Sequence, residues 1–212
     1  MIVTIGHTKG GVGKTVLTVN LAAALALQGK SVYLVDGDRQ ASSYYAMQAR
    51  RQGCIEPPIA HDNEPDGKKL AALVDAGAKK FDHVLIDVGG RDSSALRAAL
   101  VVSDLLIIPF APRSLDVWAM ADIDELIQEA RKINPKLTAK AVINGADSVG
   151  NDNKAAVDVV AQYPNIEYLD APIGWRKSFA SSIGYGQSVL EHKPKDRKAI
   201  AEVSKLVNII FG

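Results

Sequence analysis

The stretch from Ile2 to Thr15 reads IVTIGHTKGGVGKT and joins an apolar, β-branched run to a glycine-rich loop. An apolar helical pattern begins directly after the loop, at Lys14. A strand, a flexible loop and a helix in this order are the setting that a phosphate-binding loop requires. Glycines let the backbone bend until several N–H groups point at phosphate oxygens, and the helix N-terminus adds partial positive charge. The stretch therefore predicts an α/β protein that binds a nucleotide.

The loop holds two lysines with different expected tasks. The residues expected to bind the phosphates of ATP are Gly10, Gly11, Val12, Gly13, Lys14, Thr15 and Val16. We expect Lys14 to reach the β- and γ-phosphates and the Thr15 hydroxyl to ligate Mg²⁺. Thr8 stands where the usual pattern has glycine, and a second lysine, Lys9, precedes the paired glycines. The alternative is a glycine-rich turn before a helix, with both lysines solvated.

Apolar runs alternate with helical patterns along the rest of the chain. The predicted strands are Ile2–Gly6, Ser31–Asp36, His83–Asp87, Leu105–Pro109, Ala139–Asn144 and Tyr168–Ala171. The predicted helices are Lys14–Gln28, Ser42–Arg51, Gly67–Lys79, Ser93–Val102, Leu115–Lys132, Asn153–Gln162, Arg176–Ile183 and Asp196–Ile210. Three prolines predict a loop near residues 53–66. The alternation predicts one doubly wound α/β domain over residues 1–212, with a mostly parallel sheet and helices on both faces.

Composition narrows the class of protein. Hydrophobic residues make up 47% and charged residues 23%, which argues against disorder. The longest apolar runs, such as Leu21–Leu27, are far shorter than the roughly 20 residues that span a bilayer, so we expect no transmembrane segment. Cys54 is the only cysteine, which excludes an internal disulfide and a cysteine-rich metal site. The simplest expectation is a cytoplasmic protein.

The charge is distributed unevenly along the chain. From Pro172 to Gly212 there are seven Lys/Arg against three Asp/Glu, so this segment is +4 while the whole chain is +1. A basic C-terminal segment favours an anionic partner, although a solvated helix face explains the charge equally well.

Several motifs resemble those of one family. The K-G-G-x-G-K-T form of Lys9–Thr15 resembles the deviant Walker A motif of the ParA/MinD ATPases. The segment Tyr33–Gln40, YLVDGDRQ, resembles the second acidic motif of that family, and Val84–Asp87, VLID, resembles its Walker B strand. The region Pro172–Val189 is similar to the C-terminal part of the family. The chain therefore looks like a short ParA-type ATPase without an N-terminal helix-turn-helix.

The resemblance implies an ATP-sandwich homodimer with catalytic residues Lys9, Lys14 and Asp38. Lys9 matches the signature lysine that reaches across to the nucleotide of the partner subunit, where it acts like an arginine finger supplied in trans. Asp38 matches the acid associated with the attacking water. Asp87 ends an apolar strand, where a carboxylate is costly without a partner, and a Mg²⁺ shell would supply one. The implied metal-site residues are thus Thr15 and Asp87.

The resemblance also implies where the base of ATP lies. Asn144 matches a position that reads adenine with its amide, although an Asx turn with Gly145 is an equally good explanation. Pro172 and Ile173 match the segment whose backbone lies beside the base.

A second implied activity is ATP-dependent, sequence-nonspecific DNA binding. The residues that match it are Arg176, Lys195, Arg197 and Lys198. It further implies a centromere-binding or cargo-adaptor protein as partner, and association with the nucleoid. Trp175 is expected to be buried, the alternative being a stack on a nucleic-acid base. Arg39 departs from the Pro-Gln that usually continues the acidic motif, and we expect it to pair with a surface acid rather than with phosphate, a partner subunit or an adaptor.

Three functions compete, and the partitioning ATPase is favoured. A MinD-like membrane-associated ATPase is the first alternative, because Val203, Leu206, Val207 and Ile210 form an apolar stripe. The same stripe is expected of a last helix packed on the sheet, which we favour. A metabolic P-loop ligase is the second alternative, and it would not need Lys9.

Overall fold

A parallel sheet forms the centre of the computed structural model, which describes residues 1–91, 93–112, 117–147 and 152–212. The eight strands follow the order β3-β2-β4-β1-β5-β6-β7, and β8 pairs with β6 off this path. Their bounds are β1 Ile2–Ile5, β2 Val32–Asp36, β3 Ala60–Asn63, β4 His83–Asp87, β5 Leu105–Phe110, β6 Thr138–Ala146, β7 Glu167–Tyr168 and β8 Ile173–Gly174. All of these strand pairs are parallel, as the buried, apolar strands predicted.

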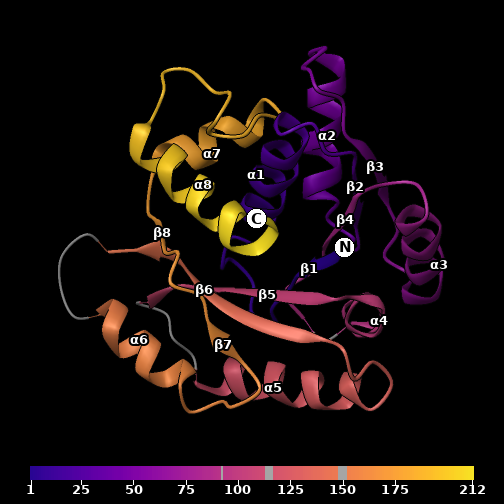
Figure 1. Cartoon of the computed structure of the whole chain (residues 1–212), viewed down its shortest axis with the longest axis vertical. Coiled ribbons are helices and arrows are strands. Elements are labelled where there is room, and N and C mark those ends of the chain that lie inside the picture. The colour runs from indigo at the N-terminus through magenta and orange to yellow at the C-terminus, as the bar shows by residue number, and fades with distance from the viewer. Residues whose placement is uncertain (92, 113–116, 148–151) are drawn as a thin grey trace.

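Helices cover both faces of the sheet (Figure 1). On one face lie α1 (Lys14–Leu27), α2 (Ser42–Gln52), α7 (Lys177–Gly184) and α8 (Arg197–Phe211). On the other lie α3 (Gly67–Ala78), α4 (Ser94–Val102), α5 (Val117–Arg131) and α6 (Asp152–Val160). The predicted start of the fifth helix, at residues 115 and 116, lies outside the described residues. The doubly wound α/β prediction is confirmed.

Three of the described helices, α3, α4 and α8, begin after a side chain that binds their free N–H groups. Asp66 accepts from the Lys69 N–H before α3, and Ser93 accepts from the Leu96 N–H before α4. Asp196 accepts two such bonds before α8. By contrast, the N-cap residue of α1 is Gly13, which forms no side-chain cap. The cap residue of α1 therefore does not compete with an anion for the free N–H groups of the helix.

Two predictions for the sheet are wrong. The expected loop at 53–66 contains β3, whose polar residues carry no strand pattern and which is held by parallel pairing with β2. Of the expected strand Tyr168–Ala171 only Tyr168 lies in a strand, β7, and the next strand, β8, begins beyond it at Ile173; β7 and β8 pair with different parts of β6. In both places pairing with a neighbouring strand outweighs local propensity.

The apolar stripe of α8 packs into the protein, as we favoured. Val203, Leu206 and Val207 are buried, and Ile210 packs against the same cluster. This cluster includes α1 residues such as Leu21 and Leu25. Among the described residues, no helix is both long and apolar enough to cross a membrane.

Candidate nucleotide site

The glycine-rich loop makes a tight turn between β1 and α1. Gly11 and Gly13 have positive φ angles, of 75° and 86°, which other residues rarely adopt. The side chain of Asn144 crosses to the loop, where its Nδ2 donates to the Val12 carbonyl at 2.8 Å. A Cβ at Gly13 would lie 1.9 Å from that Nδ2, so glycine is required there for two independent reasons. The loop conformation is thus determined both locally and by a distant strand.

Lys14, Thr15 and Asp87 meet at the start of α1. The buried Lys14 Nζ donates to the Lys9 carbonyl at 2.8 Å, across the loop. The Thr15 hydroxyl donates to Asp87 Oδ2 at 2.8 Å. The other carboxylate oxygen of Asp87, Oδ1, is buried and has no hydrogen-bond partner among the residues that the structure describes. An unpartnered carboxylate oxygen beside a hydroxyl is a donor set that fits Mg²⁺.

The electrostatics of this site also favour a cation. Asp36 and Asp87 are register partners on the adjacent strands β2 and β4. Burial, and then the neighbouring Asp36, raise the pKa of Asp87 to about 7, while the Thr15 hydroxyl partly opposes the shift. Burial also lowers the pKa of Lys14, against the attraction of Asp87 and Asp38. The site contains more buried carboxylate than its own cations stabilise, which favours binding of a further cation.

The acidic loop after β2 is held from several sides. Asp36 accepts from the Asp38 N–H, from Ser43 Oγ and from the Tyr44 N–H, so it joins the strand end to the first turn of α2. Asn63, in the unpredicted strand β3, donates to the carbonyls of Asp36 and Asp38, both at 2.9 Å. Asn63 was missed because a polar residue within an expected loop carries no sequence signal. Asp36 therefore acts as a cap that joins the end of β2 to the start of α2.

The Gly89-Gly90 pair lies between the acidic loop and the phosphate loop. A Cβ at Gly89 would lie 3.1 Å from Asp38 Oδ2. A Cβ at Gly90 would lie 2.6 Å from the Gly10 Cα, a distance that side chains do not tolerate. The backbone after β4 is therefore in direct contact with both loops.

The residues before the paired glycines form hydrogen bonds with His7, which follows β1, and with α5. The buried His7 accepts the Lys9 N–H at its Nδ1, at 3.1 Å. Thr8, in place of the usual glycine, donates its hydroxyl to the Ala119 carbonyl at 3.3 Å. Lys9 itself is partly buried. Thr8 thus anchors the loop to α5, which explains how a side chain is accommodated there.

The opposite end of the site is formed by β6 and β8. Asn144 lies within β6 rather than in an Asx turn, and it pairs with the buried Ile173 of β8. The preceding Pro172 is partly buried. The structure thus brings Asn144, Pro172 and Ile173 together beside the phosphate loop, while adenine recognition by them stays a prediction. The expected burial of Trp175 is wrong, since its side chain is 86% exposed.

The four predicted DNA-binding residues differ in their surroundings. Arg176 donates to both carboxylate oxygens of Glu202, at 2.5 and 3.2 Å, and Lys195 donates to the Leu190 carbonyl. Arg197 and Lys198 are exposed. Near the start of α8 an open pocket of about 560 Å³ is lined by Lys177, Ser178, Ser181, His192, Pro194, Lys195, Asp196, Arg197 and Lys198. The basic groups other than Arg176 therefore gather around one hollow.

The expected ion pair of Arg39 is also wrong. Arg39 is exposed, and no described residue forms an ion pair with it. It follows Asp38 directly in the acidic loop, so its charge lies beside the site.

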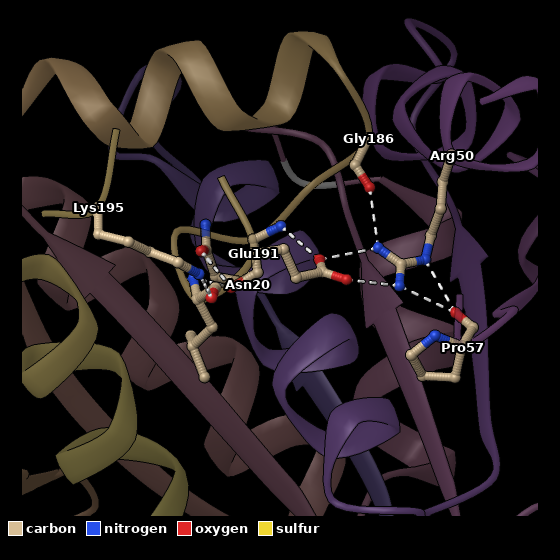
Figure 2. Close-up of polar contacts among 8 residues, drawn as sticks. Asn20, Arg50, Pro57, Gly186, Glu191 and Lys195 are labelled. Carbon is tan, nitrogen blue, oxygen red and sulfur yellow. Dashed lines mark hydrogen bonds and ion pairs between the residues drawn. The ribbon is translucent and has the colours of Figure 1, made fainter. Parts of the chain in front are cut away.

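A buried ion pair that the sequence did not predict joins α2 to the segment before α8 (Figure 2). Arg50, near the end of α2, donates to both oxygens of Glu191, at 2.8 and 2.9 Å. Its remaining donors bind the carbonyls of Pro57 and Gly186. Asn20 of α1 accepts from the hydroxyl and the N–H of the adjacent segment at Ser188 and Val189. The segment 186–191 is thereby fastened to the two helices that start at the nucleotide site.

Known proteins match the chain over most of its length. Residues 3–189 match the CobQ/CobB/MinD/ParA nucleotide binding domain. The "Maintenance of carboxysome distribution protein A" of Halothiobacillus neapolitanus is 26% identical over 209 residues, which are 98% of this chain and 94% of that protein.

Solved structures agree in fold. The apo McdA structure from Cyanthece has a TM-score of 0.79 at 15% identity, covering 100% of this chain and 99% of its own. The septum site-determining protein MinD of Pyrococcus horikoshii OT3, complexed with Mg-ADP, has a TM-score of 0.76 at 20% identity, covering 99% and 95%. Because the family match spans residues 3–189, the chain belongs to the CobQ/CobB/MinD/ParA family of nucleotide-binding domains.

Proposed function

We propose that this protein is a Mg²⁺-dependent positioning ATPase in which ATP closes a sandwich homodimer that binds DNA without regard to sequence. A partner protein then stimulates hydrolysis and releases the dimer from DNA, so that a cargo is moved or spaced on the nucleoid. The observation that carries the proposal is the phosphate loop with two lysines, Lys9 and Lys14, set against the Asp87 carboxylate. The similarity to a carboxysome distribution protein supports a cargo other than a plasmid equally well.

The residues of the site have distinct roles in the proposed hydrolysis. Bound Mg²⁺, held by Thr15 and Asp87, would neutralise charge on the phosphate oxygens. Lys14, already directed across the loop, binds the β- and γ-phosphates. Asp38, held by the acidic loop, orients the attacking water. The Gly89-Gly90 backbone contacts both loops, which suits a segment that responds to the γ-phosphate.

Lys9 separates this proposal from a metabolic P-loop ligase. An ammonium that neutralises phosphate charge in the partner subunit is needed only in a dimer that closes around nucleotide. The variants Lys9→Ala and Asp38→Ala are each expected to lose DNA-stimulated ATP hydrolysis by on the order of 10³-fold. Lys9→Ala is also expected to disturb the ATP-dependent dimer, measured by light scattering.

The matched control for these variants is Lys68→Ala, which removes an exposed lysine from α3. It should leave hydrolysis and dimer formation unchanged. Unaltered DNA-stimulated turnover in both Lys9→Ala and Asp38→Ala would exclude the proposed mechanism.

DNA binding is proposed to depend first on Arg197 and Lys198. Both are exposed at the basic pocket, whereas Arg176 is engaged by Glu202 and Lys195 by the Leu190 carbonyl. Each phosphate neutralised adds affinity and salt dependence, and a homodimer doubles the basic surface. Binding of duplex DNA, measured with ADP, with ATP and with a slowly hydrolysed analogue over a salt series, is expected only with the triphosphates. Binding that ignores the nucleotide would contradict the switch.

A MinD-like membrane function is the weaker alternative. The stripe of α8 that would insert into a bilayer is already used in the core, through Val203, Leu206 and Val207. Flotation with vesicles of anionic lipid in the presence of ATP tests it directly. Capture by vesicles, without binding to DNA, would favour the membrane function over ours.

A further inference from the structure

Trp175 is the most exposed large hydrophobic side chain of the described residues, at 86%. It follows β8 directly, at the edge of the sheet where the strands end. One edge of its indole lies beside β6, since a Cβ added at Gly145 would lie 3.4 Å from the Trp175 Cε3. Most of the ring faces solvent. An indole that is left uncovered beside a strand is an aromatic surface available for a ligand.

The strand order shows on which side of the loop the base of a nucleotide must lie. Asp36 and Asp87, on β2 and β4, stand to one side of β1, whereas β5 and β6 stand to the other (Figure 1). The carboxylate that fits Mg²⁺ therefore places the terminal phosphates toward β4. With the phosphates on the loop, the ribose and base extend the opposite way, toward β6.

Neighbouring residues lead from the loop to the indole on that side. Asn144 donates to the Val12 carbonyl of the loop, and Gly145 follows Asn144 in β6. Gly145 in turn lies beside the indole of Trp175. The indole is thus separated from the phosphate loop by only two residues of one strand. The neighbouring basic side chain, Arg176, is bound to Glu202.

We propose that Trp175 stacks on the purine base of the bound nucleotide, a role that rests on the nucleotide binding proposed above. Stacking needs a flat π-surface and no hydrogen bond, so Trp175 contributes affinity for any purine and leaves the choice of base to polar groups. Covering the indole with the base also removes its exposed apolar surface from water.

Fluorescence tests the contact directly. The chain has two tryptophans, so Trp118→Phe leaves Trp175 as the only one. Mg²⁺-ADP is expected to quench the emission of this variant saturably, at the concentrations at which calorimetry detects binding. ADP is the probe because it occupies the site without hydrolysis.

Variants of Trp175 test the energetic contribution. Trp175→Ala is expected to bind ADP and GDP about ten-fold more weakly, the size of one lost aromatic–base contact, and Trp175→Phe to recover most of the loss. Binding of pyrophosphate, which has no base, should be equal in Trp175→Ala and the parent. Tyr185→Ala removes another aromatic side chain, 65% exposed, and should change none of these affinities.

The outcomes that overturn the inference are separable from failure of the proposed function. Unchanged ADP affinity in Trp175→Ala overturns the stacking alone, as does quenching that requires added DNA or ATP-driven dimer formation. An equal loss of pyrophosphate affinity shows a general disturbance of the loop and overturns it as well. Absence of ADP binding by the parent protein overturns the proposed function and this inference together.

Discussion

Two buried ionic clusters, one near the end of α2 and one at the start of α1, differ in how many of their hydrogen bonds are formed. Near the end of α2 the guanidinium of Arg50, 2% exposed, binds both oxygens of Glu191 and the carbonyls of Pro57 and Gly186. At the start of α1 Asp87, equally buried, has one oxygen bound by Thr15 and one without a partner among the described residues.

The difference separates a cluster whose hydrogen bonds are complete from one with capacity for a ligand. A buried charge whose hydrogen bonds are complete holds segments together and has no capacity for a ligand. A buried carboxylate that lacks a partner destabilises the folded chain and is suited to binding a cation. Burial and charge alone do not distinguish the two clusters, whereas their hydrogen-bond partners do.

Removing one member of the complete cluster is expected to have the largest effect on stability. Glu191→Ala leaves Arg50 buried without its counter-ion, which should lower the free energy of unfolding by about 3–5 kcal/mol. Urea denaturation measures the change. The matched control is Glu129→Ala, which breaks the exposed Arg97–Glu129 pair and should cost less than about 0.5 kcal/mol. Equal losses of unfolding free energy in both variants would show that the buried ion pair stabilises the fold no more than an exposed one.

Removing the charge of the incomplete cluster is expected to act in the opposite direction. The pKa of Asp87 is raised from 3.8 to about 7 in the folded chain. Ionising Asp87 near neutral pH therefore costs free energy in the folded chain that it does not cost in the unfolded chain. The stability of the parent should fall as the pH rises from about 4 to 7. Without Mg²⁺ and nucleotide, Asp87→Asn should therefore be more stable than the parent at pH 8, by about 2–4 kcal/mol, with the gain absent near pH 4.

Thermal unfolding with and without Mg²⁺-ADP measures this gain in stability. Mg²⁺-ADP should stabilise the parent much more than Asp87→Asn, since the variant lacks the carboxylate proposed to bind the metal. Asp75→Asn, an exposed change on α3, serves as the control and should alter neither quantity. A variant that is less stable than the parent at pH 8 would contradict the account of Asp87.

Asp36 is intermediate between the clusters and should give the smallest effect. It is fully buried and accepts three hydrogen bonds, yet burial still raises its pKa. Ser43→Ala removes one bond to a charged acceptor and should cost about 2 kcal/mol. Ser182→Ala is the matched control, because it removes an equally buried hydroxyl that donates to the neutral Phe179 carbonyl, at about 1 kcal/mol. A loss no larger than that of the control would show that Asp36 is not charged in the fold.

The elements that the sequence predicted well are those whose signal is local. Glycine spacing, apolar runs and a carboxylate at a strand end lie within a few residues of one another, and they predicted the loop at Lys9–Thr15 and Asp87. The strand β3 was missed because Ala60–Asn63 becomes a strand only through pairing with β2. Asn63, which holds the acidic loop, was missed with it.

Side-chain environments were predicted less well than the helices and strands that carry the side chains. An aromatic residue beside a basic one is compatible with burial or exposure, and only the folded structure shows that Trp175, directly after β8, is exposed. The apolar stripe of α8 was ambiguous for a related reason, since a helix facing a sheet and a helix facing a bilayer have the same pattern.

The sequence by itself determined that the chain is an α/β protein with a phosphate loop, because backbone freedom, helix start and strand pattern are properties of short segments. The tertiary structure alone decided which charges are satisfied. Arg50 and Glu191 are 141 residues apart, and Thr15 and Asp87 are 72 apart. Whether a buried charge has partners depends on such long-range contacts, and at Lys9–Thr15 they distinguish a glycine-rich turn from a site with capacity for a cation.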